Sequence, residues 1–250
     1  MKFFDCHCSF GMRSIRYPGS FYQMEDLVRK MKSYGIEKAL VYHSMAQEYN
    51  PEAGNQMLMK AIQGIPSLVP VWVVMPHHTG EFPEPDELAR QMKENAIQAV
   101  TMFPGAADQT YSTGEWNCGG LFEMLEEQRV PLFLGMEQTS WDDLQELLSR
   151  HPQLNVILTN VNYRIDRNLY AMLEKHDHLF LETYGYKVYG GIEAICRRFG
   201  ARRLLFGSGM PVFSGSGAVS MINYAQISEE EKQKIAYKNL ENLLKGVRQA

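Results

Sequence analysis

The sequence predicts a single α/β domain over residues 1–250, folded as a TIM-like (β/α)8 barrel. Short apolar runs alternate with amphipathic segments along the whole chain, and no linker or low-complexity segment interrupts them. The runs are almost continuous in Val, Leu, Ile and Phe, which is typical of parallel strands that are buried on both faces. The chain length also fits one barrel of this kind.

Eight runs have this strand-like character. The predicted strands span residues 2–6, 38–42, 69–75, 97–103, 130–134, 155–159, 178–182 and 203–206. Eight strands that alternate with helices favour a closed barrel over an open sheet. A doubly wound sheet is the alternative, because the sequence does not reveal the order of the strands.

Helix signals lie between the runs. Apolar residues at helical spacing are Met24, Leu27, Val28 and Met31, and Gly35 stands where that helix should end. Ser140 is placed to cap a second helix. Ser228 and Glu231 form a capping-box pattern that opens the last helical segment.

Composition and charge exclude several classes of protein. The net charge is −4, with 25 basic and 29 acidic residues interspersed, so no basic patch indicates nucleic-acid binding. No apolar run approaches the roughly 20 residues of a membrane span. Asp5 interrupts any signal-peptide core, and the four cysteines are too scattered for a disulfide framework. We therefore expect a cytoplasmic protein whose partner is a small molecule.

The first strand ends in a polar stripe. Because side chains alternate along a strand, Asp5, His7 and Ser9 should share the face that points into the barrel mouth. Cys6 and Cys8 should then pack against helices on the other face. A metal or redox site at the two cysteines is the weaker alternative, because a C-x-C pair lacks the further ligands that zinc requires.

These motifs, in this order, resemble the amidohydrolase-related (amidohydrolase 2-like) metal-dependent hydrolases. The first strand is similar to the family's Asp-x-His-x-His motif, and residues 204–211 are similar to its Leu-Phe-Gly-Ser-Asp-x-Pro motif. Residues 130–135 and 155–160 resemble two strands that end in histidines in relatives, and residues 238–244 resemble the closing helix. The resemblance implies a barrel that binds a divalent metal at its mouth.

Most of the metal ligands that the resemblance implies are replaced. Ser9, Gly135, Asn160 and Gly209 stand where relatives carry three histidines and an aspartate, so only His7 remains. A catalytic zinc takes three protein ligands plus water. We therefore predict that no stoichiometric metal occupies the family's position.

Other side chains at strand ends offer two alternatives. A rebuilt site for a divalent metal such as Zn or Mn would use His7, His43, His77, Glu137 and Glu182. Alternatively, these groups are solvated or bonded within the mouth. A metal-free site would instead pair His7 with Asp5 or Glu182 for acid–base catalysis, although a structural pair has the same sequence signature.

Two loops supply candidate substrate-binding residues. Arg13 and Arg16 suit a carboxylate, although surface arginines are commonly solvated. Trp116 lies in a long segment, 104–120, and either covers a ligand or packs on another protomer of a homo-oligomer. The Gly-rich segment 213–217 either binds an anion at a helix start or is a flexible loop.

These observations predict a hydrolase of the amidohydrolase-related type that acts on a small carboxylate-bearing substrate. The predicted catalytic residues are His7, Asp5 and Glu182. The predicted substrate-binding residues are Arg13, Arg16, His43, His77, Glu137, Asn160 and Trp116. The alternatives are a decarboxylase-like carbon–carbon lyase on the same barrel and a ligand-binding barrel without catalysis.

Overall fold

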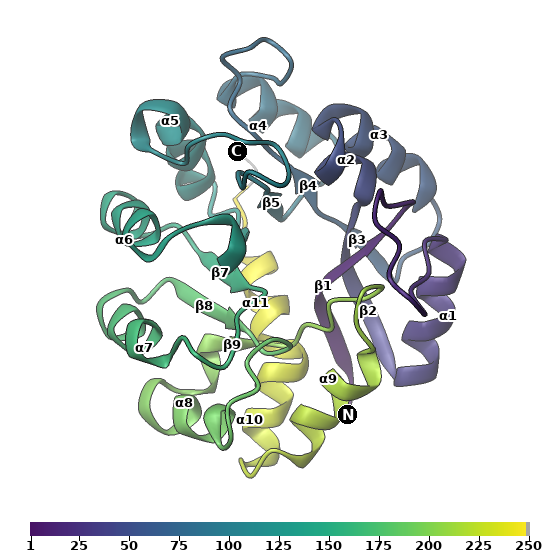
Figure 1. Ribbon diagram of the computed structural model, residues 1–250, viewed down its shortest axis with the longest axis vertical. Coiled ribbons are helices and arrows are strands. Elements are labelled where there is room, and N and C mark those ends of the chain that lie inside the picture. The colour runs from purple at the N-terminus through teal and green to yellow at the C-terminus, as the bar shows by residue number, and fades with distance from the viewer. Residues whose placement is uncertain (249–250) are drawn as a thin grey trace.

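Parallel strands surrounded by helices make up residues 1–248, which the computed structural model describes (Figure 1). The strands are β1 (Phe3–Phe10), β2 (Ile36–His43), β3 (Leu68–Pro70), β4 (Trp72–Val73), β5 (Val100–Met102), β6 (Leu132–Gly135), β7 (Val156–Thr159), β8 (Leu179–Glu182) and β9 (Leu204–Leu205). The helices are α1 (Met24–Tyr34), α2 (Ser44–Glu48), α3 (Pro51–Ala61), α4 (Pro85–Glu94), α5 (Glu115–Glu127), α6 (Trp141–Arg150), α7 (Asp166–Lys175), α8 (Gly191–Phe199), α9 (Gly215–Tyr224), α10 (Glu229–Gln233) and α11 (Asn239–Lys245). None of the helices in this part of the chain is long and apolar enough to cross a membrane.

The strands form the predicted TIM-like barrel. They pair in parallel in the order β1-β2-β3 and β4 to β9. Only Val71 separates β3 from β4, and its amide donates to the carbonyl of Val41 at 2.8 Å, so the two short strands share one position in the barrel. The ring closes where the amide of Cys6 donates to Phe206 and the amide of Ser9 donates to Met210, both at 2.9 Å. The prediction of a closed barrel is therefore confirmed.

Two apolar cores flank the strands. The inner core fills the barrel with side chains such as Phe4, Leu40, Val73 and Phe133. Leu240 of α11 belongs to the same core, and Figure 1 shows α11 behind the ring of strands. The outer core joins the strands to the surrounding helices. Because the strands are buried on both faces, their sequences are almost continuous runs of apolar residues.

The predicted helix ends are confirmed. Gly35 follows α1 with φ of 73°, and its amide donates to the carbonyl of Lys32, as in a glycine C-cap. Ser140 accepts a hydrogen bond from the amide of Asp143, and Ser228 forms the capping box that opens α10. These caps position the helices that enclose the barrel.

The predicted alternation of β1 is wrong in part. The four residues of β1 from Asp5 to Cys8 face only three residues of β2, from Ala39 to Val41, so β1 contains an irregularity that shifts its register. Cys6 therefore joins the inner core, whereas Cys8 packs in the outer core, as predicted. Asp5 is also turned away from the mouth, as described below. A strand irregularity of this kind has no sequence signal that alternation alone can detect.

Candidate functional site

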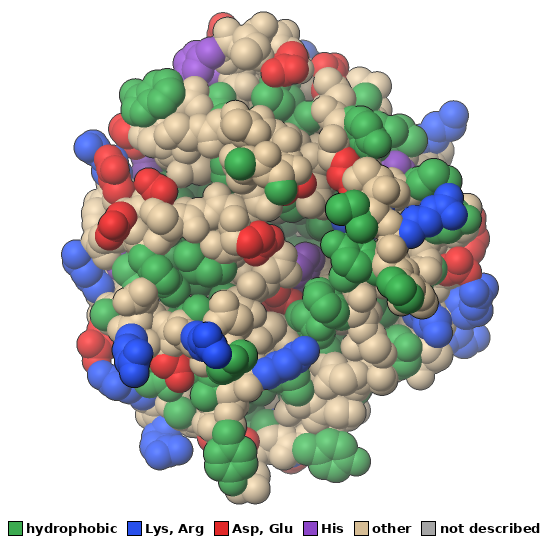
Figure 2. Space-filling model, viewed as in Figure 1, with side chains coloured by type: hydrophobic (Ala, Val, Ile, Leu, Met, Phe, Trp, Pro, Cys, Tyr) green, Lys and Arg blue, Asp and Glu red, His purple; other side chains and the backbone are tan. Residues whose placement is uncertain are grey.

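A cavity of about 670 Å³ opens at the carboxyl ends of the strands, where barrel active sites lie. Its wall includes the ends of β1, β2, β5, β6 and β7 and the segment that follows β9. Figure 2 shows a hollow near the centre of this face, with histidine and acidic side chains at its floor. Of the predicted site residues, this cavity brings together His7, Arg13, Glu137 and Asn160.

His7 is paired with a buried carboxylate beneath the cavity. Its Nδ1 lies 3.3 Å from Oε2 of Glu182, whose side chain is fully buried. Because a carboxylate only accepts, Nδ1 carries the proton, which leaves Nε2 for the cavity. Gly207 makes room for this carboxylate, since a Cβ there would lie 2.4 Å from Cγ of Glu182.

The environment of His7 raises the pKa of its imidazole above 6.5. Burial by itself lowers this pKa, because an apolar surrounding disfavours the charged ring. The negative charge and hydrogen bond of Glu182, together with the charges of Asp5 and Glu137, raise the pKa by more than burial lowers it. The site therefore favours the imidazolium form of His7.

Asn160 joins the two carboxylates of the site. Its amide donates to Oε2 of Glu182 at 3.2 Å, and its side-chain Nδ2 donates to Oε1 of Glu137 at 2.8 Å. Asn160 adopts a φ of 51°, a conformation that asparagine tolerates better than most residues. His7, Glu182, Asn160 and Glu137 thus form one continuous polar network on the floor of the cavity.

Asp5 does not line the cavity. It is fully buried, and its Oδ1 accepts hydrogen bonds from the amides of Ser208 at 2.9 Å and His7 at 3.1 Å. Burial raises its pKa to about 6. This geometry ties β1 to the segment after β9, beneath the site, and it gives Asp5 no contact with the cavity.

Arg13 is the cation of the cavity. Its Nη2 donates to Oγ of Ser9 at 2.5 Å, and its Nη1 donates to Oε1 of Gln47 at 3.5 Å. Its Nε is buried and has no hydrogen-bond partner. Within residues 1–248 no carboxylate pairs with Arg13, so its charge is left for a ligand. Arg16 is exposed and lies outside the cavity.

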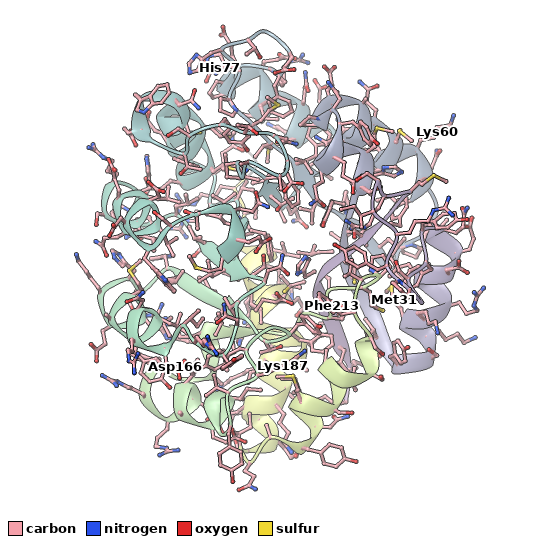
Figure 3. All side chains as sticks on the ribbon, viewed as in Figure 1. Met31, Lys60, His77, Asp166, Lys187 and Phe213 are labelled. Atoms are coloured by element: carbon pink, nitrogen blue, oxygen red, sulfur yellow. The ribbon has the colours of Figure 1, made fainter. Side chains whose placement is uncertain are left out.

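Three predicted site residues lie elsewhere. His43 caps α2, where its Nδ1 accepts from the amide of Met45 at 3.1 Å, and burial lowers its pKa. His77 packs against His78 with their tilted rings 4.2 Å apart between centroids, in the loop at the edge of the barrel (Figure 3). Trp116 is 79% exposed on α5. None of the three lines the cavity.

Several residues of the cavity were not predicted. Tyr184 follows β8 by two positions and stacks on Phe213, with ring centroids 4.5 Å apart. Gln47 of α2 and Asp108 of the 103–114 segment bond to each other on another side of the mouth. Proximity to the end of β8 could have indicated Tyr184. No strand end precedes Gln47 or Asp108 directly, so the sequence offers no comparable signal for them.

The divalent metal implied by the family resemblance does not fit the family's position. A Cβ at Gly135 would lie 2.4 Å from Oε1 of Glu137, so a carboxylate fills the space of the missing side chain. Gly209 adopts a φ of 67°, and a Cβ there would lie 2.9 Å from Cδ2 of Phe213. Ser9 is bonded to Arg13. In the described part of the chain no group of three His, Cys, Asp or Glu side chains could hold a metal ion, so the rebuilt set is not assembled.

Comparisons with solved structures agree with the barrel. The chain is similar to a TIM-barrel protein from Bordetella bronchiseptica, with 16% identity, a TM-score of 0.75, and coverage of 98% of this chain and 99% of that one. It is similar to 2,6-dihydroxybenzoate decarboxylase from Rhizobium, with 15% identity, a TM-score of 0.74, and 98% coverage of both chains. A third similar structure is 5-carboxyvanillate decarboxylase from Novosphingobium aromaticivorans, complexed with manganese and 4-hydroxy-3-methoxy-5-nitrobenzoic acid. Its identity is 14%, its TM-score 0.75, and the coverage 97% of this chain and 96% of that one.

At these identities the structural similarities establish the fold alone. No functionally curated protein matches the sequence. The amidohydrolase family model matches residues 4–245, which is nearly the whole chain and agrees with the motifs at the strand ends. This protein therefore belongs to the amidohydrolase family.

Proposed function

We propose that this protein is a hydrolase that cleaves a small carboxylate-bearing substrate at the barrel mouth by acid–base catalysis. The observation that carries the proposal is the pair of His7, which lines the cavity, with Glu182, which is buried beneath it; His7 Nδ1 and Glu182 Oε2 are 3.3 Å apart. A histidine held by a carboxylate and facing a cavity is the arrangement of a general acid or base. The same network places a second carboxylate, that of Glu137, at the cavity wall.

His7 is the proposed general acid. Its raised pKa favours the protonated ring, and Glu182 orients that ring through Nδ1. The proton on Nε2 is then available for the leaving oxygen or nitrogen of the substrate. Before the transfer, the same N–H can stabilise negative charge that develops on a carbonyl oxygen.

Glu137 is the proposed general base. Its Oε1 accepts from Asn160, and the side chain is exposed to the cavity, so its other oxygen can take a proton from an attacking water. The water oxygen bonds to the substrate carbonyl carbon as that proton leaves. His7 protonates the leaving group when the old bond breaks, and water then restores both groups. The proton that Glu137 gains and the proton that His7 loses are exchanged through this water, so the cycle returns both groups to their starting states and the protons balance.

Arg13 is the proposed anchor for the substrate carboxylate. Guanidinium binds carboxylates through two parallel hydrogen bonds, and this one has only neutral partners in the described residues. Tyr184 and Phe213 form an apolar wall of the same cavity. These features support a small organic acid with an apolar part.

A decarboxylase-like carbon–carbon lyase is the second candidate. It is favoured by the similarity in fold to two proteins that are named decarboxylases. On this barrel the imidazolium of His7 would protonate the carbon that loses carbon dioxide, and Arg13 would hold a carboxylate. This reaction consumes no water, so it does not need Glu137 as a base. A ligand-binding barrel without catalysis is the remaining alternative.

The experiment that tests the proposal measures turnover of two panels by wild type and by Glu137→Gln. One panel holds carboxylate-bearing esters, lactones and amides, and the other holds aromatic and aliphatic carboxylic acids assayed for carbon dioxide. We expect hydrolysis, and a loss of roughly 10²-fold or more in Glu137→Gln. Glu123→Gln, on the exposed face of α5, is the matched control. Release of carbon dioxide that survives Glu137→Gln would favour the lyase, and no turnover of either panel would favour the binding barrel.

Turnover should depend on pH through His7. The pKa of His7 is raised, so the acid form is present at low pH and is lost as the pH rises through that raised value, above 6.5. We therefore expect kcat to fall on the alkaline side. In Glu182→Gln the raising charge is absent, so the alkaline limb should move to lower pH. NMR titration of the His7 ring measures the same shift without substrate, and an unshifted titration would contradict the pairing.

A further inference from the structure

We infer that Gln47 positions Arg13 for carboxylate binding and that Asp108 fixes the orientation of Gln47. The inference rests on the proposed function, since it assigns a specificity-determining residue to the same cavity. Gln47 lies on α2, a short helix directly after β2, and its side chain lines the mouth.

The amide of Gln47 can face only one way. Its Nε2 donates to Oδ1 of Asp108 at 3.1 Å. An ionised carboxylate accepts and does not donate, so the nitrogen must be the end that faces Asp108. The oxygen end then accepts from the hydroxyl of Tyr42 at 3.1 Å and from Nη1 of Arg13 at 3.5 Å. Asp108 thereby turns the side-chain oxygen of Gln47, and not its nitrogen, towards the guanidinium of Arg13.

Asp108 is itself held from two sides. While Oδ1 faces Gln47, Oδ2 accepts from Nε2 of Gln138 at 2.8 Å. The oxygen of Gln138 accepts from the amide of Gly105 at 2.7 Å. Gln109 adds a bond from its Nε2 to the carbonyl of Ala46 at 2.8 Å. The 103–114 segment is thus fastened to α2 and to the end of β6.

The same short helix fastens the loop that carries Arg13. Oγ of Ser44 donates to the carbonyl of Met12 at 2.7 Å, and the amide of Ser14 donates to Glu48 at 2.7 Å. Both residues that flank Arg13 are therefore tied to α2. The guanidinium is placed relative to the floor of the cavity by α2 and by Ser9.

The neutrality of Gln47 matters for selectivity. Arg13 is held by an amide and a hydroxyl, which orient its donors without neutralising its charge. A fixed carboxylate at position 47 would pair with Arg13 and compete with an anionic ligand. Gln47 therefore serves binding of a carboxylate better than either an apolar or an acidic residue would.

The test is a double-mutant cycle read by calorimetry. Wild type, Gln47→Leu, Arg13→Met and the double variant are titrated with small carboxylic acids and with their neutral primary amides. We expect wild type to prefer the acids. Gln47→Leu should weaken binding of the acids on the order of tenfold and leave the amides nearly unchanged. In the Arg13→Met background, Gln47→Leu should have no further effect on the acids.

Two further variants complete the design. Gln47→Glu keeps an oxygen towards Arg13 but supplies a fixed charge, and we expect it also to lose the preference for acids. Gln145→Leu, on α6 and remote from the cavity, should bind as wild type does. Thermal melting establishes that each variant is folded.

The outcomes separate the inference from the proposed function. Wild type that binds no carboxylate overturns both. Wild type that prefers acids, together with a Gln47→Leu variant that binds them equally well, overturns the inference alone. A loss in Gln47→Leu that persists undiminished when Arg13 is already Met also overturns it, because Gln47 would then act through the general structure of the mouth.

Discussion

Replacing His7 by Gln is expected to lower kcat by roughly 10²–10⁴-fold, the usual contribution of a general acid. Glutamine can still donate to Glu182, so the buried carboxylate keeps a partner, but it has no titratable proton to transfer. His7→Ala should lose the same activity and also some stability, because the buried Glu182 then loses its only charged partner and keeps just the backbone amide of Asn160 among the described residues. The comparison of the two variants separates catalysis from folding.

The measurement is kcat at saturating substrate, together with the free energy of unfolding of each variant. His178→Gln is the matched control, since His178 precedes β8 and bonds to Asn155 at the opposite end of the barrel. A His7→Gln variant with wild-type kcat would remove His7 from the mechanism. The loss of kcat in His7→Gln should also come with loss of the alkaline limb of the pH profile.

Replacing Arg203 by Met is expected to lower the free energy of unfolding by about 3–5 kcal/mol, because several buried backbone carbonyls each lose a donor at a cost of roughly 1–3 kcal/mol. Arg203 is only 3% exposed, and Figure 1 places its neighbour β9 beside α8 and the last helices. Its Nη1 donates to three backbone carbonyls, those of His176, Asp177 and Leu179, at 2.6–2.9 Å. Its Nη2 donates to the carbonyl of Leu173 at 2.9 Å. Methionine fills the volume but leaves these acceptors without a donor.

Arg202 provides a control next to it in the chain. Nη2 of Arg202 donates to the side-chain Oδ1 of Asp177 at 3.0 Å, but the side chain of Arg202 is 59% exposed. Arg202→Met should therefore lower the free energy of unfolding by less than about 1 kcal/mol. Denaturation by urea measures both free energies. Equal effects of the two substitutions would show that the buried carbonyl network contributes little.

The barrel could be predicted from the sequence because its strands are buried on both faces. The predicted runs 130–134 and 155–159 agree closely with β6 (Leu132–Gly135) and β7 (Val156–Thr159). Side-chain capping at Ser140 and Ser228 is encoded locally, so those helix starts could also be read directly. The break between β3 and β4 and the irregularity in β1 depend on pairing with neighbouring strands, and the sequence does not show them.

The site could be predicted only in part. His7, Glu137 and Asn160 follow strand ends closely, so the barrel geometry brings them to one cavity. His77 also follows a strand closely, but its loop leads outward, away from the mouth. His43 sits at the end of β2 yet is used to cap α2. The end of a predicted strand indicates where along the barrel a residue lies, but it does not indicate where the side chain of that residue points.

The residues that hold Arg13 are the part of the site that the sequence predicts least well. Gln47 and Asp108 are far apart in sequence, and their bond depends on how α2 and the 103–114 segment meet over the barrel. Glycine at positions 135 and 209 indicates, in the sequence, the loss of metal ligands. In the structure, side-chain atoms of Glu137 and Phe213 lie close to where a Cβ at these two positions would stand.

The central claim is that side chains of this protein carry out the chemistry of the site in place of a metal. The most direct test is elemental analysis of the purified protein, combined with carboxylate binding and turnover before and after exhaustive chelation. We expect no stoichiometric metal, and unchanged affinity and kcat after chelation. A stoichiometric ion bound with His7, whose removal abolishes binding or turnover and whose return restores them, would contradict the claim.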